Sequence, residues 1–311
     1  MTDTIAILGS PTALGGHFPG MDKGPSALRA VNLLERLRGR AGLAGASLID
    51  HGDVPIEAGW WADTDPIMKN WQRIIDYLPQ LAARVEQVMG AAGGGAVSDT
   101  NRLLLLGGDC TSHAAAMAGL KRRDPNARLA IAWFDAHGDF NIPTTTPSGN
   151  VWGMPFAMLC GRGDPSLVKA CDGPTVKEED AALLGGQVLD QEESRMLAAS
   201  PIAHFGAGML AGPAGLAALE TWARVVGARC DGMYIAFDLD AIDASESLSV
   251  AMPERGGISV WTAVIAVRLL AASNRIVGFG PTATMPRSGT DLNKTADVVA
   301  QLTEAALGAA A

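Results

Sequence analysis

The sequence predicts an α/β fold in which a doubly wound, mostly parallel sheet forms the centre. Short apolar runs alternate along the chain with longer amphipathic stretches, which is the pattern of βαβ units. The apolar runs are almost continuous, as expected for parallel strands that are buried on both faces. The chain has 311 residues, of which 48% are hydrophobic and 18% are charged. This composition is typical of a packed protein, and we expect a single domain over residues 1–311.

Six predicted strands account for the apolar runs, at residues 4–10, 46–52, 102–108, 129–137, 232–240 and 275–280. Apolar residues recur at spacings of three and four between or after these strands, which predicts helices at residues 25–37, 66–89, 111–121, 260–272 and 296–309. Residues 90–95 are rich in glycine but lack a phosphate-binding pattern, so we expect a surface loop there.

Charge and cysteine content exclude several classes of protein. The formal net charge of −9 gives no basic surface for nucleic acid or for anionic lipid. The sequence shows no secretory signal and no apolar run of the roughly 18 residues that a membrane helix needs, so we expect a cytoplasmic protein. The four cysteines are widely spaced, which argues against a disulfide framework and against a zinc knuckle.

Three predicted strands end in polar motifs: Gly-Gly-Asp-Cys at 107–110, Asp-Ala-His-Gly-Asp at 135–139 and Asp-Leu-Asp at 238–240. The carboxyl ends of parallel strands lie at one edge of a sheet, where ligands bind. A single aspartate at such a place is usually a helix cap or a loop acid. Four aspartates and a histidine together favour a site for divalent cations, because unpaired buried carboxylates repel one another.

These motifs resemble the ureohydrolase superfamily of arginases, agmatinases and formiminoglutamases. The family carries GGDHS, DAHxD and DxDxxDP, where this chain has GGDCT, DAHGD and DLDAIDA. The segment 20–29, GMDKGPSALR, resembles a further family motif. The resemblance implies a three-layer α/β/α fold, an oligomer such as a trimer or hexamer, and hydrolysis of a linear C–N bond. It also implies two divalent ions, usually manganese, that are bridged by the nucleophilic hydroxide.

Carried over by position, the family's metal ligands correspond to six residues of this chain. Asp135 and Asp238 would bridge the two ions; Cys110 and Asp139 would complete one shell, and His137 and Asp240 the other. Asp135, His137 and Asp238 are therefore our candidate catalytic residues. Cys110 replaces a family histidine, as in the branch that cleaves hydroxyarginine, and a thiolate ligand is also compatible with nickel, zinc, cobalt or iron. His113, one helical turn after Cys110, is an alternative ligand.

The resemblance also assigns a substrate pocket. Asn141, Ser148 and Asn150 match the arginase loop that holds the substrate carboxylate. Three other pocket positions differ from arginase: Trp152 replaces a histidine, Met252 a small hydroxyl residue, and Ala283 the glutamate that binds the guanidinium group. We therefore expect a guanidino or amidino compound that is not plain arginine.

Further pocket candidates are less specific. Glu254 is an alternative carboxylate for the guanidinium, although an exposed ion pair is the commoner role of such a residue. His17 lies on the first loop that faces the active edge. The stretch after His204 lacks the acids that arginase places near the substrate's amino group.

Two functions stay open on the sequence. The first is an active hydrolase of a small-molecule substrate. Its support is that the chain retains five of the six metal ligands of the family. The second is a weak or inactive family member that binds a metal or a small ligand, alone or beside an active paralogue. The altered positions 110, 152 and 283 favour this second hypothesis.

Overall fold

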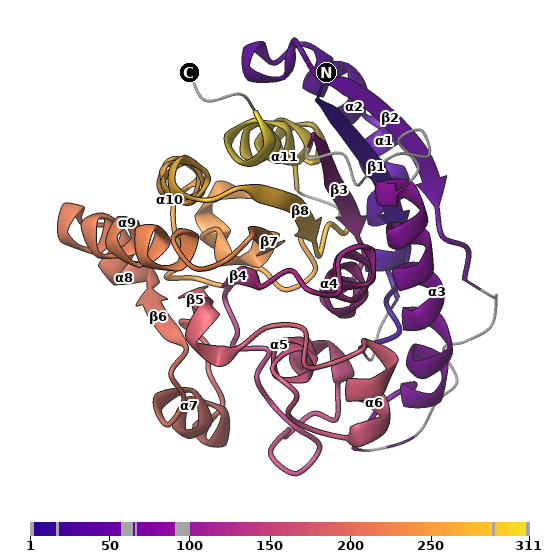
Figure 1. Cartoon of the computed structure of the whole chain (residues 1–311), viewed down its shortest axis with the longest axis vertical. Coiled ribbons are helices and arrows are strands. Elements are labelled where there is room, and N and C mark those ends of the chain that lie inside the picture. Colours follow the sequence, from indigo (N-terminus) through magenta and orange to yellow (C-terminus); the bar gives the residue numbers. More distant parts are fainter. Residues whose placement is uncertain are drawn as a thin grey trace.

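Eight parallel strands form one sheet in the computed structural model (Figure 1), which describes residues 3–16, 19–56, 65, 67–90, 100–287 and 290–308. The strand order is β2-β1-β3-β8-β7-β4-β5-β6, and every pairing is parallel. The strands are β1 (Thr4–Ser10), β2 (Ser47–Asp53), β3 (Asn101–Gly107), β4 (Leu129–Asp135), β5 (Ala181–Gly185), β6 (Ala203–Gly206), β7 (Gly232–Asp238) and β8 (Ile276–Thr282).

Helices cover both faces of the sheet, so the predicted three-layer α/β/α fold is confirmed. One face packs against α3 (Trp71–Gly90), α4 (Thr111–Arg123), α5 (Pro155–Leu159) and α6 (Pro165–Ala170). The other face packs against α1 (Gly24–Ala30), α2 (Leu33–Arg38), α8 (Ala207–Leu210), α9 (Pro213–Gly227), α10 (Val260–Ser273) and α11 (Leu292–Leu307). Figure 1 shows α4 and α5 on one side of the strands and α10 on the other.

Alternation along the strands explains the two cores. In β3, Leu103 and Leu105 belong to the core beside α3 and α4, whereas Leu104 and Leu106 belong to the core beside α10 and α11. All four side chains are fully buried. A strand with both faces covered needs apolar residues at every position, which is why these runs were recognisable in the sequence.

All six predicted strands are present. The sequence patterns did not predict β5 and β6, or the helices α7 (Gln191–Ala198) and α9. β5 and β6 have five and four residues, too few for a clear periodic signal. The predicted helix 25–37 is two helices, because Asn32 adopts a left-handed conformation with φ 60° between them. The predicted helix 66–89 begins later, at Trp71, after Asn70 with φ 55°.

Two other predictions fall partly outside the described residues. The helix predicted at 296–309 begins earlier, at Leu292, where the Asp291 side chain accepts the Lys294 backbone N–H; residue 309 is not described. The glycine-rich loop predicted at 90–95 lies, except for Gly90, outside the described residues. Over the described ranges, none of the helices is both long and apolar enough to cross a membrane.

Candidate metal centre and substrate pocket

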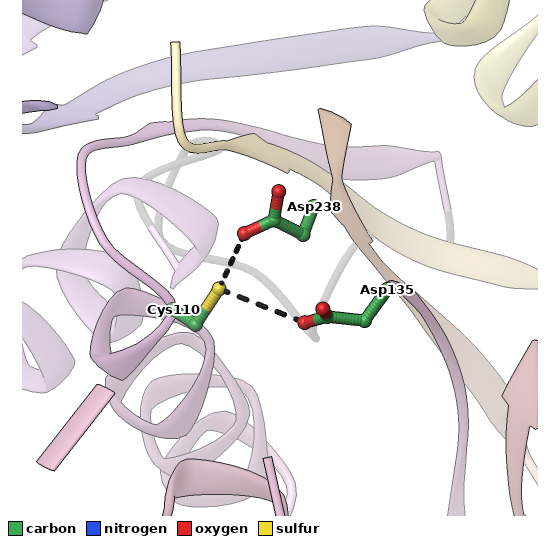
Figure 2. A group of neighbouring side chains, drawn as sticks. All are labelled: Cys110, Asp135 and Asp238. Carbon is green, nitrogen blue, oxygen red and sulfur yellow. Dashed lines mark hydrogen bonds between the residues drawn. The ribbon is translucent and has the colours of Figure 1, made fainter. Parts of the chain in front are cut away.

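Cys110, Asp135 and Asp238 come together where three strands end (Figure 2). Cys110 directly precedes α4, Asp135 is the last residue of β4, and Asp238 is the last residue of β7. The Cys110 thiol donates a hydrogen bond to Asp238 Oδ2 over 2.9 Å, and its sulfur lies 4.0 Å from Asp135 Oδ2. All three side chains are buried.

A second group shares Asp135 with the first. His137 Nδ1 lies 3.3 Å from Asp135 Oδ1 and 3.2 Å from Asp240 Oδ2. In each group, one ligand atom from every residue lies within 4.8 Å of the others. The fold therefore places Asp135 between two clusters of possible ligands, which is the arrangement that a pair of neighbouring cations requires.

Asp139 adds a buried carboxylate to the same cavity. Its side chain is 5% exposed, and Oδ2 is without a hydrogen-bond partner among the described residues. Its backbone has φ 48°, in the left-handed region that non-glycine residues rarely adopt. A buried, unpartnered carboxylate oxygen is costly unless a cation or a bound water satisfies it. This atom therefore fits a metal centre.

The electrostatics of the site also fit cations. Burial, and then repulsion between neighbouring carboxylates, raises the pKa of Asp238 and of Asp139 well above the usual range, and raises the pKa of Asp240. Burial and the nearby aspartates likewise raise the pKa of the Cys110 thiol. Burial favours neutral His137, yet the attraction of Asp240 and Asp135 is larger in sum and raises its pKa. The cluster therefore has an excess of acidic groups, and bound cations would stabilise their charged forms.

Behind Cys110 lies a chain of buried polar groups. Thr282 Oγ1 is 3.5 Å from the Cys110 sulfur and 3.2 Å from His113 Nε2, and His113 Nδ1 is 3.0 Å from the Tyr234 hydroxyl. Burial lowers the pKa of His113 to about 3, so the ring is neutral. Both ring nitrogens face these hydroxyl groups, and His113 belongs to neither ligand group.

A cavity of about 360 Å³ opens onto the candidate metal ligands. Its lining includes every residue that the sequence assigned to the site, namely the six candidate ligands with Asn141, Ser148, Asn150, Trp152, Met252 and Ala283. These residues come from five separate stretches of the chain. The fold therefore brings all twelve of these residues to one cavity.

Trp152 and Ala283 are fixed by the backbone around them. The backbone N–H of Trp152 donates a hydrogen bond to the Gly15 carbonyl over 3.0 Å. The indole ring lies against Gly16, because a β-carbon added there would be 1.6 Å from Trp152 Cζ3. Ala283 has φ 61°, and its N–H donates to the Gly108 carbonyl over 2.7 Å.

Two acidic residues of the lining, Asp190 and Glu193, were not among the candidates from the sequence. Asp190 and Glu193 form the capping box of α7, and Asp190 Oδ2 accepts a hydrogen bond from Asn141 Nδ2 over 2.9 Å. The stretch after His204 contributes no acid to the lining, as expected; Asp190 and Glu193 come from the start of α7 instead. An Asp-x-x-Glu pattern after a short apolar run was the available signal.

For Glu254 the sequence left two roles open, a carboxylate in the pocket and an exposed ion pair. Its side chain is only 32% exposed, and Oε1 lies 3.8 Å from His137 Nε2. It lines the cavity together with Met252 and Ala283. The candidate His17 lies outside the described residues.

Comparisons with known proteins agree with this geometry. The family model described as "Arginase family" matches residues 3–308. An arginase of Bacillus subtilis (strain 168) is 31% identical over 310 residues, which cover 99% of each chain. The native structure of an arginase from Bacillus caldovelox superposes with a TM-score of 0.86 at 29% identity, and 99% of each chain is covered. A formimidoylglutamase of Bacillus subtilis shares the fold with a TM-score of 0.72 at 18% identity, over 98% of this chain and 86% of that one.

Proposed function

The chain belongs to the arginase family, and we propose that it hydrolyses a C–N bond in a guanidino- or amidino-type compound with an amino-acid-like tail, in preference to plain arginine. The observation that carries the proposal is the convergence of Cys110, Asp135, His137, Asp139, Asp238 and Asp240 on one cavity.

Two divalent cations are the proposed cofactors. Asp135 is shared by both ligand groups, Cys110 and Asp238 complete one group, and His137 and Asp240 complete the other. Bound there, the cations activate water as a nucleophile at neutral pH and stabilise the negative charge that develops in the reaction. Manganese is the cation suggested by the family, whereas the sulfur of Cys110 is compatible with softer ions such as zinc.

The proposed reaction adds water across the guanidino or amidino carbon. The water oxygen forms a bond to this carbon, the C–N bond to the leaving amine breaks, and the amine takes up a proton. The products are an amine and a urea or an amide. The carboxylates are buried, and this low-dielectric setting strengthens the electrostatic interactions around the reacting carbon.

The polar wall of the cavity supports a tail of amino-acid type. Asn141, Ser148 and Asn150 offer amide and hydroxyl groups that bind a carboxylate. Asp190 and Glu193 offer carboxylates to an ammonium group on the same ligand. One wall thus carries partners for both charges of an amino acid.

The wall around the reacting carbon supports a preference for a substrate other than plain arginine. Trp152, Met252 and Ala283 present mainly apolar surface there, and Ala283 offers no carboxylate to a guanidinium. An apolar or neutral substituent on the guanidino nitrogen suits this surface. Glu254 supplies a carboxylate from another loop, close to His137, and we propose that it is the partner of whatever positive charge the substrate retains.

The test is hydrolysis by protein supplied separately with manganese, zinc, nickel, cobalt and iron. Release of urea, ammonia and amine is measured with arginine, agmatine, guanidino acids, N-substituted arginines including the N-hydroxylated form, and linear amidines. Asp238→Asn is the inactive control. Turnover of an N-substituted compound with kcat/KM above that of arginine supports the proposal. A higher kcat/KM for arginine would contradict the proposed substrate preference and leave the proposed hydrolysis standing.

The competing function is a non-catalytic family member, which the altered positions 110 and 283 favour. Less than one metal ion bound per chain, together with no turnover under any ion, would establish that alternative.

A further inference from the structure

Lys69 reaches across to the loop that carries the candidate tail-binding residues. Its ammonium donates hydrogen bonds to the Ser148 carbonyl over 2.7 Å and to Asn150 Oδ1 over 2.9 Å. Its backbone N–H donates to the Gly149 carbonyl over 2.9 Å. One residue thus holds three consecutive residues of a loop that lies 79 positions further along the chain.

The segment around Lys69 is itself held in place. Asp65 Oδ1 accepts the backbone N–H groups of Ile67 and Met68, over 2.8 and 3.0 Å. Asn70 Nδ2 donates to the Leu14 carbonyl over 3.0 Å, and α3 begins at the next residue. Lys69 is therefore presented by an anchored turn at the start of a 20-residue helix, and its side chain is positioned before any ligand arrives.

The Lys69 ammonium fixes the orientation of the Asn150 side-chain amide. A lysine ammonium can only donate, so the atom of Asn150 that meets it must be the carbonyl oxygen. The NH2 end of the amide is then directed away from Lys69. Asn150 lines the cavity. Its NH2 group carries two donor hydrogens, so it can donate to an anion as well as to a protein group.

The charge of Lys69 matters because the cavity wall is acidic. Eight of the described lining residues are aspartate or glutamate, and none is lysine or arginine. A ligand carboxylate that entered such a cavity would meet repulsion from these groups, among them Asp190, which accepts a hydrogen bond from Asn141. An ammonium directly behind Ser148 and Asn150 offsets that repulsion at the position where the carboxylate would bind.

We propose that Lys69 is a positioning residue that makes the pocket selective for ligands with a carboxylate on the tail. The inference deepens the proposed function and rests on it for the identity of the pocket. It concerns the tail of the ligand, remote from the reacting carbon, so it is tested by binding as well as by turnover.

The binding test compares ornithine with putrescine, which is the same diamine without the carboxylate, on full-length protein supplied with manganese. Calorimetry is done on the unaltered protein and on Lys69→Met, Lys69→Arg and Lys177→Met. Lys177 is exposed and lies outside the cavity lining, so it is a matched control for the loss of one lysine. We expect Lys69→Met to weaken ornithine binding roughly 10-fold or more, the effect of one lost charge-assisted hydrogen bond, and to leave putrescine unchanged.

Lys69→Arg should recover most of the affinity for ornithine, because it keeps the charge and can still donate to the loop. Arginine and agmatine differ in the same way, and kinetics apply if the protein hydrolyses both. Lys69→Met should then raise KM for arginine and not for agmatine. The kcat values should change little, since the tail is bound equally in the ground and transition states.

Two results would overturn the inference. One is equal weakening of ornithine and putrescine by Lys69→Met, which is the effect of a merely structural lysine. The other is unaltered protein that does not bind ornithine more tightly than putrescine. A protein that turns over none of the compounds but shows the predicted binding pattern would refute the proposed hydrolysis and leave the role of Lys69 standing.

Discussion

The thiol of Cys110 donates a hydrogen bond to Asp238 Oδ2 over 2.9 Å and so joins the start of α4 to the end of β7. Burial, and then repulsion from Asp238 and the other aspartates, raises the pKa of this thiol, so the sulfur keeps its proton and adds no further negative charge to the cluster. A divalent cation would replace that proton and use both atoms as ligands. The hydrogen bond therefore marks one proposed metal position.

Replacing Cys110 tests that position. We expect Cys110→His to bind manganese relatively better, and zinc relatively worse, than the unaltered protein, because imidazole is a harder ligand than thiolate. The ratio of the two dissociation constants should change about 10-fold or more, the scale on which changes at a metal site act. Competition titrations with the two ions measure it. Unchanged ratios would show that the Cys110 sulfur is not a ligand.

Removal of metal should destabilise the protein. Cations that bind the folded state alone stabilise it by about 2.7 kcal/mol at a concentration 100 times the dissociation constant. Treatment with a chelator should therefore lower the melting temperature by several degrees, and added manganese or zinc should restore it. In Asp238→Asn the response should be much smaller, because one carboxylate ligand is lost. Equal responses of the two proteins would count against Asp238 as a ligand.

Glu254 and Ala283 can be tested as a pair. Glu254→Gln should lower kcat/KM for a cationic guanidino substrate roughly 30-fold or more, since an unpartnered buried charge costs about 2–5 kcal/mol. Hydrolysis of neutral analogues should change little. Adding Ala283→Glu to this variant should recover part of the activity toward the cationic substrate. Metal content is measured in parallel, because Glu254 Oε1 lies 3.8 Å from His137 Nε2 and a loss of metal would be a different cause.

Gly16 sets the position of Trp152. A β-carbon at Gly16 would lie 1.6 Å from Trp152 Cζ3, so Gly16→Ala must displace the indole ring. We expect a loss of about 1–3 kcal/mol in the free energy of unfolding, typical of overpacking, and a changed KM. Gly208→Ala, where an added β-carbon has nothing within 4 Å, is the control. A Gly16→Ala protein with the stability and KM of that control would show that the ring is loosely held.

Glu193 should make stability depend on pH. Burial raises the pKa of its carboxyl group from 4.5 to about 7, so the folded protein holds this proton more tightly than the unfolded chain does. Stability should therefore fall as the pH rises from 4.5 to 7, by about 3 kcal/mol at 1.36 kcal/mol per pKa unit, and this contribution should be constant outside that range.

Denaturant unfolding of metal-free protein between pH 4.5 and 8 measures the slope of the free energy of unfolding against pH. Glu193→Gln should make the slope shallower by the Glu193 contribution and leave the part that is due to Asp139, Asp238 and Asp240, whose pKa values are also raised. The variant starts from a lower stability because the capping box of α7 is broken. Glu220→Gln, at an exposed position of α9, should keep the original slope. If the slope in Glu193→Gln equals that of the unaltered protein, Glu193 does not contribute to it.

The sequence determined the central sheet, the edge at which the site lies and the six candidate ligands. Those features are local: four consecutive leucines in β3 are buried on two faces, and the polar motifs begin at the last residues of β3, β4 and β7. The strand-end position fixes roughly where such side chains lie, whatever surrounds them. Short elements such as β5 and β6 gave too little signal, and Asn32 and Asn70 altered helix limits through left-handed conformations.

Only the tertiary structure decided what surrounds the ligands. Lys69 meets Asn150, Asp190 meets Asn141 and Glu254 approaches His137 across sequence separations of 81, 49 and 117 residues. Such contacts depend on how whole elements pack, and no local pattern encodes them. A surface glutamate and one that lines a cavity have the same sequence letter; the difference lies in the loop that carries the side chain and in the cavity that it faces.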